Sequence, residues 1–251
     1  MLRDLTRKPG EFDGLGVRLR GREMTRLETL VDAAFAFSIT MLALSPDRIP
    51  ASFEQMYELL KGIPAFLFSL GILMLFWNSH VVFSRRYGLD DGPTKLLSIA
   101  YIAVMLVYVY PLKFMATAFF AYYIPPLRTP DFFTAGTTND LAAMFAVMSA
   151  GFVLLSLLDG ALYAHALRRA RPLDLSDHER RVTRCEIWST LLHAGIGLLS
   201  ITLAFVFRNS LWVISAGFVY ALLGVVIPVY WVRFGPSRAD CDAAKREPIL
   251  D

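Results

Sequence analysis

Six long apolar stretches, separated by short polar segments, follow one another along the chain. They occupy residues 29–45, 63–83, 96–123, 141–166, 187–207 and 211–232. At a rise of 1.5 Å per residue, a helix of about 20 residues crosses the roughly 30 Å hydrocarbon core of a bilayer. The pattern therefore predicts an all-α integral membrane protein with six transmembrane helices.

Short polar motifs indicate where several of these helices begin. Residues 52–55 (Ser-Phe-Glu-Gln) and 176–179 (Ser-Asp-His-Glu) fit the capping box, in which a hydroxyl and an acidic or amide side chain satisfy the first backbone N–H groups. The first motif predicts a short interfacial helix before the second span. The second predicts that the fifth helix begins in water and enters the membrane near Ile187. Asp91 opens the third span, and Pro46 ends the first.

The composition supports a membrane protein and excludes several other classes. Apolar residues make up 55% of the 251 positions, charged residues only 19%, and the mean hydropathy is +0.48. Soluble domains carry about 25% charged residues, and disordered chains have low hydrophobicity. We find no internal repeat and no signal peptide. We therefore expect one membrane domain over residues 26–233, between a basic segment, 1–25, and a tail, 234–251.

The positive charges predict the orientation of the chain in the membrane. Of 25 Lys and Arg, twenty fall in the terminal segments and in the loops after the second and fourth spans, and four fall in the opposite loops. By the positive-inside rule both termini are cytoplasmic, in a multi-pass protein of the cell membrane. The basic N-terminus either only fixes this topology or also attracts anionic lipid. No basic stripe on a soluble domain indicates nucleic-acid binding.

A few ionisable side chains interrupt the apolar spans, where their cost makes each a candidate functional residue. They are Arg26, Asp32, His80, Lys113, Asp159, His165 and His193. All except Lys113 fall toward the cytoplasmic ends of their spans, and the long stem of Lys113 can snorkel to the outer face. No His spacing typical of a metal site and no phosphate-binding loop is present. We therefore expect no metal, no cofactor and no enzymatic activity.

Helix geometry suggests partners for two of these groups. Arg26 and Asp32 are six residues apart, so they point about 120° away from each other and each needs a partner on another helix. Trp77 and His80 are three residues apart on one face of the second span, and both carry an N–H donor. That face suits the Asp32 carboxylate. Such a network either supports a gate or serves as a structural link between helices.

The first span also carries an apolar stripe. Phe37, Met41 and Leu44 follow the spacing i, i+4 and i+7, with Thr40 beside them. A stripe of this kind is typical of core packing, and pore lining is the functional alternative.

The first span resembles the first helix of the transmembrane protein 175 family, which includes prokaryotic potassium channels and a lysosomal relative. Arg26 and Asp32 match the Arg and Asp of the family motif, and an apolar run follows them. Trp77 and His80 match the Trp-x-x-His of the family's second helix, and Pro111 matches a proline of its third.

The resemblance implies a passive, potassium-preferring cation channel, with potassium and other monovalent cations as partners. It implies a homotetramer in the lipid bilayer, in which four first helices line one ion path. In the family, rings of apolar side chains narrow that path beside a ring of Thr, and the motif residues form a network between helices. The corresponding residues are Phe37, Thr40, Met41 and Leu44 for the pore, and Arg26, Asp32, Trp77 and His80 for the network.

The sequence departs from the family pattern at three positions. Leu30 and Val31 replace Phe and Ser of the motif, and Val31 removes a hydroxyl from the network. Phe37 replaces the usual Ile or Leu, so four phenyl rings either plug the constriction or attract a cation by about 0.5–2 kcal/mol each. A non-conducting structural homologue is therefore one alternative. A proton-coupled carrier that uses Asp32, His80 and Asp159 is the other.

Overall fold

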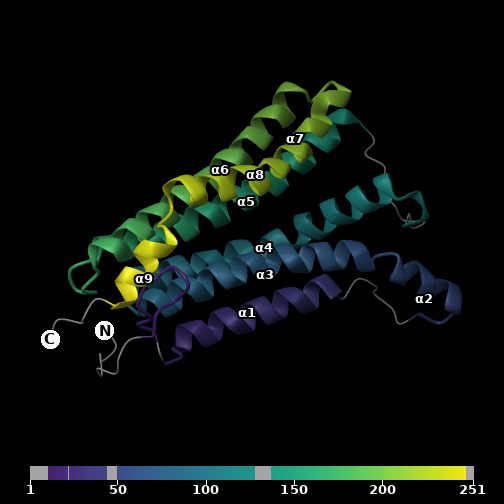
Figure 1. Cartoon of the computed structure of the whole chain (residues 1–251). Helices are drawn as coiled ribbons and strands as arrows, with labels where there is room; N and C mark the ends of the chain where they lie inside the picture. The colour runs from purple at the N-terminus through teal and green to yellow at the C-terminus, as the bar shows by residue number, and fades with distance from the viewer. Residues whose placement is uncertain (1–10, 22, 44–49, 128–136, 247–251) are drawn as a thin grey trace.

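The computed structural model describes residues 11–21, 23–43, 50–127 and 137–246. Within these ranges the chain is helical, with one isolated bridge between Phe12 and Arg18 and no strand (Figure 1). The α-helices are α1 (Arg26–Ala43), α2 (Phe53–Leu60), α3 (Ile63–Tyr87), α4 (Gly92–Tyr123), α5 (Thr138–Arg168), α6 (Asp177–Val206), α7 (Ser215–Phe218), α8 (Leu223–Phe234) and α9 (Arg238–Arg246). The 3₁₀ turns are η1 (Pro125–Leu127), η2 (Leu211–Ile214) and η3 (Val219–Leu222).

Five helical segments of the described chain are long and apolar enough to cross a membrane. They are Phe53–Tyr87, Gly92–Tyr123, Thr138–Arg168, Asp177–Val206 and Leu211–Phe234. Helix α1 is shorter, with 18 residues that include Arg26, Glu28 and Asp32. The structure thus confirms an all-helical, multi-pass membrane protein.

The predicted helix starts follow from local capping. The Ser52 side chain accepts a hydrogen bond from the Gln55 N–H at the start of α2. Ser176 and Glu179 form a complete capping box at the start of α6. The Asp91 side chain accepts from the Thr94 N–H at the start of α4. These three predictions are confirmed, because each depends only on residues within one helical turn.

The last apolar stretch is less regular than the single helix predicted for it. It passes through η2, α7 and η3 before it becomes the regular helix α8. The Ser200 hydroxyl donates to the Ala216 carbonyl at 2.8 Å and so provides that carbonyl with a partner outside its own segment. The Phe145 ring lies so close to Gly217 that a Cβ there would come within 2.8 Å of it. Contacts with α5 and α6 therefore accompany the irregular turns.

The helices form two groups that meet along α4 and α5. Helices α1, α3 and α4 lie together in one group, and α5, α6, α7 and α8 form the other (Figure 1). The largest buried cluster draws on both groups. Its members are Val31, Phe35, Leu42, Leu73, Tyr101, Met105, Tyr108, Val109, Leu112, Phe152 and Leu155.

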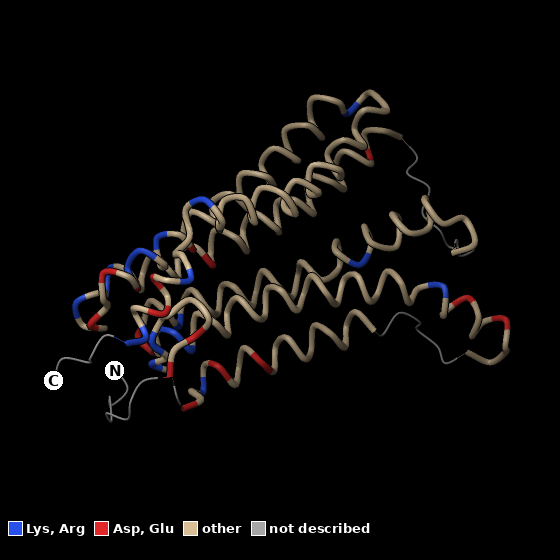
Figure 2. The backbone as a smooth tube through the Cα atoms, viewed as in Figure 1, with Lys and Arg blue, Asp and Glu red and all other residues tan. Residues whose placement is uncertain are grey.

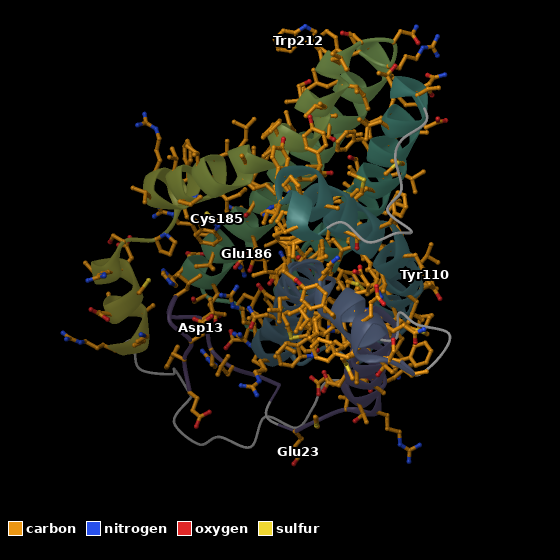
Figure 3. All side chains as sticks on the ribbon, turned by 90° about the vertical axis from the view of Figure 1, so that its right-hand side faces the viewer. Asp13, Glu23, Tyr110, Cys185, Glu186 and Trp212 are labelled. Atoms are coloured by element: carbon orange, nitrogen blue, oxygen red, sulfur yellow. The ribbon has the colours of Figure 1, made fainter. Side chains whose placement is uncertain are left out.

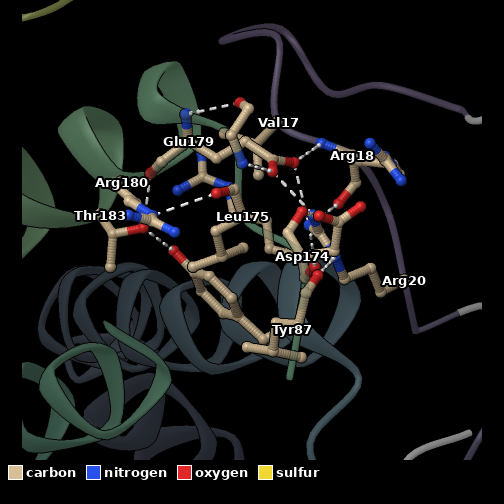
Figure 4. Close-up of polar contacts among 12 residues, drawn as sticks. Val17, Arg18, Arg20, Tyr87, Asp174, Leu175, Glu179, Arg180 and Thr183 are labelled. Atoms are coloured by element: carbon tan, nitrogen blue, oxygen red, sulfur yellow. Dashed lines mark hydrogen bonds and ion pairs between the residues drawn. The ribbon is translucent and has the colours of Figure 1, made fainter. Parts of the chain in front are cut away.

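Charged residues gather at one end of the molecule, which we call the basic end (Figure 2). It comprises residues 11–21, the end of α3, the start of α4, the end of α5, the start of α6, and α9. There the buried Arg20 pairs with Glu179 at 2.7 Å (Figure 4). Arg86 pairs with Asp13 at 2.7 Å and with Glu186 at 2.6 Å. Figure 3 labels these two acidic partners, Asp13 and Glu186. The N-terminal segment is therefore packed against the helices by ion pairs that the sequence pattern did not reveal.

Candidate functional site

Helix α1 has a buried face and an exposed face. The buried face packs against α3 and α4 and consists of Leu27, Val31, Phe35, Ser38 and Leu42. The opposite side, which we call the open face, consists of Leu30, Ala33, Ala36, Phe37, Thr40 and Ala43. Most of its side chains are small or apolar, and they follow helical spacing. A strip with these properties suits close contact with another helix in a membrane.

The residues of the predicted stripe do not share one environment. Phe37 is 56% exposed and lies on the open face. Met41 is partly buried and packs against the largest core cluster, so it lies at the edge of that face. Leu44 falls outside the described residues.

Thr40 presents an oxygen on the open face. Its Oγ1 donates a hydrogen bond to the Ala36 carbonyl one turn earlier, at 3.0 Å. The donor of the hydroxyl is thus used within the helix. Because a hydroxyl oxygen also carries two lone pairs, Thr40 retains acceptor capacity toward the exposed side.

A direct hydrogen bond joins α1 to α3. The indole Nε1 of Trp77 donates to Asp32 Oδ1 at 2.9 Å. The bond gives the Asp32 carboxylate of α1 a partner on another helix and joins the first two turns of α1 to α3.

Among the described residues, a direct hydrogen bond joins one pair of the four motif residues, Trp77 and Asp32. His80 is 2% exposed, and its Nε2 lies 3.0 Å from the Ser98 Oγ of α4 instead of reaching Asp32. Side chains three residues apart on a helix diverge by about 60°, so Trp77 reaches α1 whereas His80 reaches α4. Arg26 is exposed on the first turn of α1.

The remaining ionisable groups have separate surroundings. Asp159 is 7% exposed and accepts a hydrogen bond from the Ser79 hydroxyl at 2.6 Å, whereas its Oδ1 is buried with no hydrogen-bond partner among the described residues. His193 Nδ1 lies 2.7 Å from the Ser189 carbonyl of its own helix. Asp159 and His193 therefore have different hydrogen-bond partners and do not form a continuous polar path through the described helices.

His165 belongs to the basic end. Its Nε2 lies 2.9 Å from Asp91 Oδ2, and because a carboxylate only accepts, this nitrogen carries the hydrogen. Burial alone would raise the pKa of Asp91, but hydrogen bonds from Thr94 and His165 outweigh it and lower the pKa to about 2. Asp91 is thus an anion that links α4 to α5.

Lys113 contacts α1. Its Nζ donates to the backbone carbonyl of Leu42 at 2.6 Å. Its side chain therefore reaches from α4 to the last described turn of α1. No cluster of three His, Cys, Asp or Glu side chains suited to a metal ion occurs in the part of the chain that the structure describes.

Comparisons with known proteins agree on one family. A family model described as endosomal/lysosomal potassium channel TMEM175 matches residues 26–111, which include α1, α3 and the first part of α4. The chain is 33% identical over 217 residues to a potassium channel of Marivirga tractuosa, and the match covers 84% of this chain and 87% of that protein.

Two crystal structures share the fold. A variant of the potassium channel MtTMEM175, in complex with a nanobody–MBP fusion protein, has a TM-score of 0.80 and 30% identity, with 89% of this chain and 98% of that chain covered. A lysosomal potassium-selective channel TMEM175 homolog from Chamaesiphon minutus has a TM-score of 0.50 and 17% identity, with 84% and 97% covered. The second likeness concerns the fold alone.

Proposed function

The chain belongs to the TMEM175 family of potassium channels, and we propose that it acts as a passive, potassium-preferring cation channel of the cell membrane. In this proposal it forms a homotetramer, and the α1 helices of four copies surround one ion path. Both termini lie in the cytoplasm, and the channel needs no cofactor.

The open face of α1 is the observation that carries the proposal. Helix α1 buries one side against α3 and α4, and leaves Phe37 more than half exposed on the other. Lipid alone would accept an apolar face, but Thr40 presents oxygen lone pairs on that same face. Four such oxygens around an axis supply polar ligands for a cation, while the neighbouring side chains form apolar rings.

The apolar rings provide the barrier in this proposal. A constriction lined by apolar side chains opens and closes to ions by gaining and losing water. Phe37 supplies the bulkiest ring, and Met41 extends the constriction toward the end of α1. Leu44, outside the described residues, is the third ring expected from the family resemblance.

The motif residues position α1 in this proposal. The Trp77–Asp32 hydrogen bond sets the rotation of the helix, and therefore which side chains face the axis. His80 holds α3 to α4 through Ser98. Arg26 is exposed in the single chain and is available for a contact between subunits.

Flux measurements on reconstituted protein test the proposal. The purified protein is placed in liposomes, and potassium and sodium fluxes are compared under equal imposed gradients, with protein-free liposomes as control. We expect both ions to flow down their imposed gradients with no other energy source, and potassium to flow faster than sodium. Absence of flux for both ions would favour a non-conducting homologue.

One observation keeps the proton-coupled carrier as a second candidate. Asp159 is buried between helices, and one of its carboxyl oxygens has no described partner, so the group is a candidate for binding a proton. A carrier requires a proton gradient for transport, whereas a channel does not. The same liposomes, with and without a pH difference, distinguish the two.

A further inference from the structure

Lys113 brings a positive charge into the third apolar stretch, 96–123, where it is the sole Lys or Arg. Its ammonium group donates to the Leu42 carbonyl at 2.6 Å. Within a helix, each backbone carbonyl accepts a hydrogen bond from the N–H four residues later. The residue four places after Leu42 is Pro46, which has no backbone N–H, so the Leu42 carbonyl lacks this donor. The contact therefore gives the Lys113 ammonium group an acceptor and the Leu42 carbonyl a donor.

The Lys113–Leu42 hydrogen bond lies beside the packing of the Leu42 side chain against α4. The Leu42 side chain is 1% exposed and belongs to the same core cluster as Val109 and Leu112 of α4. Lys113 follows Leu112 directly, so packing and the charged hydrogen bond act on the same turn of α1. Thr40 lies in that turn, two residues before Leu42.

We propose that Lys113 is a positioning residue for ion selectivity. It fixes the last turn of α1 against α4, and so holds the Thr40 oxygen at a constant distance from the pore axis. The inference rests on the proposed channel function, because only a pore lined by α1 gives the position of Thr40 a consequence for ions. Without the ammonium group the helix end is free to shift or unwind, and the Thr40 oxygens no longer lie at the fixed positions from which they replace the hydration shell of potassium.

Three substitutions and one control test this inference. Lys113→Met keeps the length of the stem but removes the charge and the donor. Lys113→Arg restores both, and Lys113→Gln supplies a polar side chain too short to span the same distance. Lys95→Met is the matched control, because Lys95 lies on the same helix and, among the described residues, forms its ion pair with Asp90, at 3.5 Å on the surface. The readouts are the potassium-to-sodium permeability ratio from reversal potentials, and the melting temperature.

We expect Lys113→Met and Lys113→Gln to lower the permeability ratio by about two- to tenfold, the factor that corresponds to the net free energy of one hydrogen bond. Lys113→Arg restores most of the ratio, and Lys95→Met retains it. If Met and Gln variants that assemble normally keep the wild-type ratio, the inference is overturned. It is also overturned if Lys113→Arg lowers the ratio as much as Lys113→Met does. A wild-type protein with no ion flux overturns the channel proposal itself.

Discussion

The indole of Trp77 donates a hydrogen bond to the carboxylate of Asp32 at 2.9 Å, across 45 residues of sequence. This bond joins α3 to α1, the helix whose open face carries the proposed ion path.

Removing that donor is expected to destabilise the protein. Trp77→Phe keeps an aromatic ring but leaves Asp32 without its partner, at a cost of about 1–3 kcal/mol. The melting temperature in detergent measures the effect. Trp188→Phe is the control, because the Trp188 side chain is 60% exposed. Equal melting temperatures for Trp77→Phe and the wild type would show that the bond contributes nothing to the packing of α1.

The size of the Phe37 side chain is expected to limit conduction. Phe37→Ala widens the narrowest apolar ring, so potassium flux into liposomes should rise. Phe205→Ala is a close control, since Phe205 is 59% exposed and Phe37 is 56% exposed. An equal change in potassium flux in Phe37→Ala and Phe205→Ala would assign Phe37 to the lipid-facing surface rather than to the pore.

The buried pair Arg20–Glu179 is expected to anchor the N-terminal segment (Figure 4). Arg20→Met leaves Glu179 buried without its cation, which should lower stability by about 3–5 kcal/mol. Asp177→Asn is the control, because Asp177 is fully exposed and its contact with Arg180 is 4.0 Å long. Thermal unfolding and limited proteolysis of the N-terminal segment measure the loss. Unchanged proteolysis of Arg20→Met would contradict the anchoring role.

Asp159 distinguishes the channel from the carrier. A channel uses the Asp159–Ser79 contact only to hold α5 to α3, so Asp159→Asn should retain potassium flux, with or without a pH difference across the membrane. Ser79→Ala, which removes the other partner of the contact, is the companion variant. Proton-driven transport in the wild type that Asp159→Asn abolishes would establish the carrier instead.

Features governed by nearby residues could be predicted from the sequence. The apolar spans and the capping residues Ser52, Asp91 and Ser176 all depend on spacing within one segment. The stripe of Phe37, Met41 and Leu44 stays a prediction, because Phe37 is exposed whereas Met41 packs against the core.

Contacts between distant segments could not be predicted in the same way. Spacing placed Trp77 and His80 on one face, but only the packing of α1 and α4 decides that one reaches Asp32 and the other Ser98. Long flexible side chains are harder still. Lys113 has several directions open to it, and Arg20 finds Glu179 only because the chain folds back on the basic end.

The selectivity of a Thr40→Ala variant tests most directly whether α1 lines a potassium path. Thr202→Ala is the matched control, because Thr202 is also exposed and its hydroxyl donates to the Leu198 carbonyl at 2.9 Å, just as Thr40 donates to Ala36. The measurement is the potassium-to-sodium permeability ratio from reversal potentials in reconstituted membranes. Thr40→Ala should lower this ratio, Thr40→Ser should preserve it, and Thr202→Ala should leave it unchanged. A wild-type ratio in folded, conducting Thr40→Ala would contradict the account.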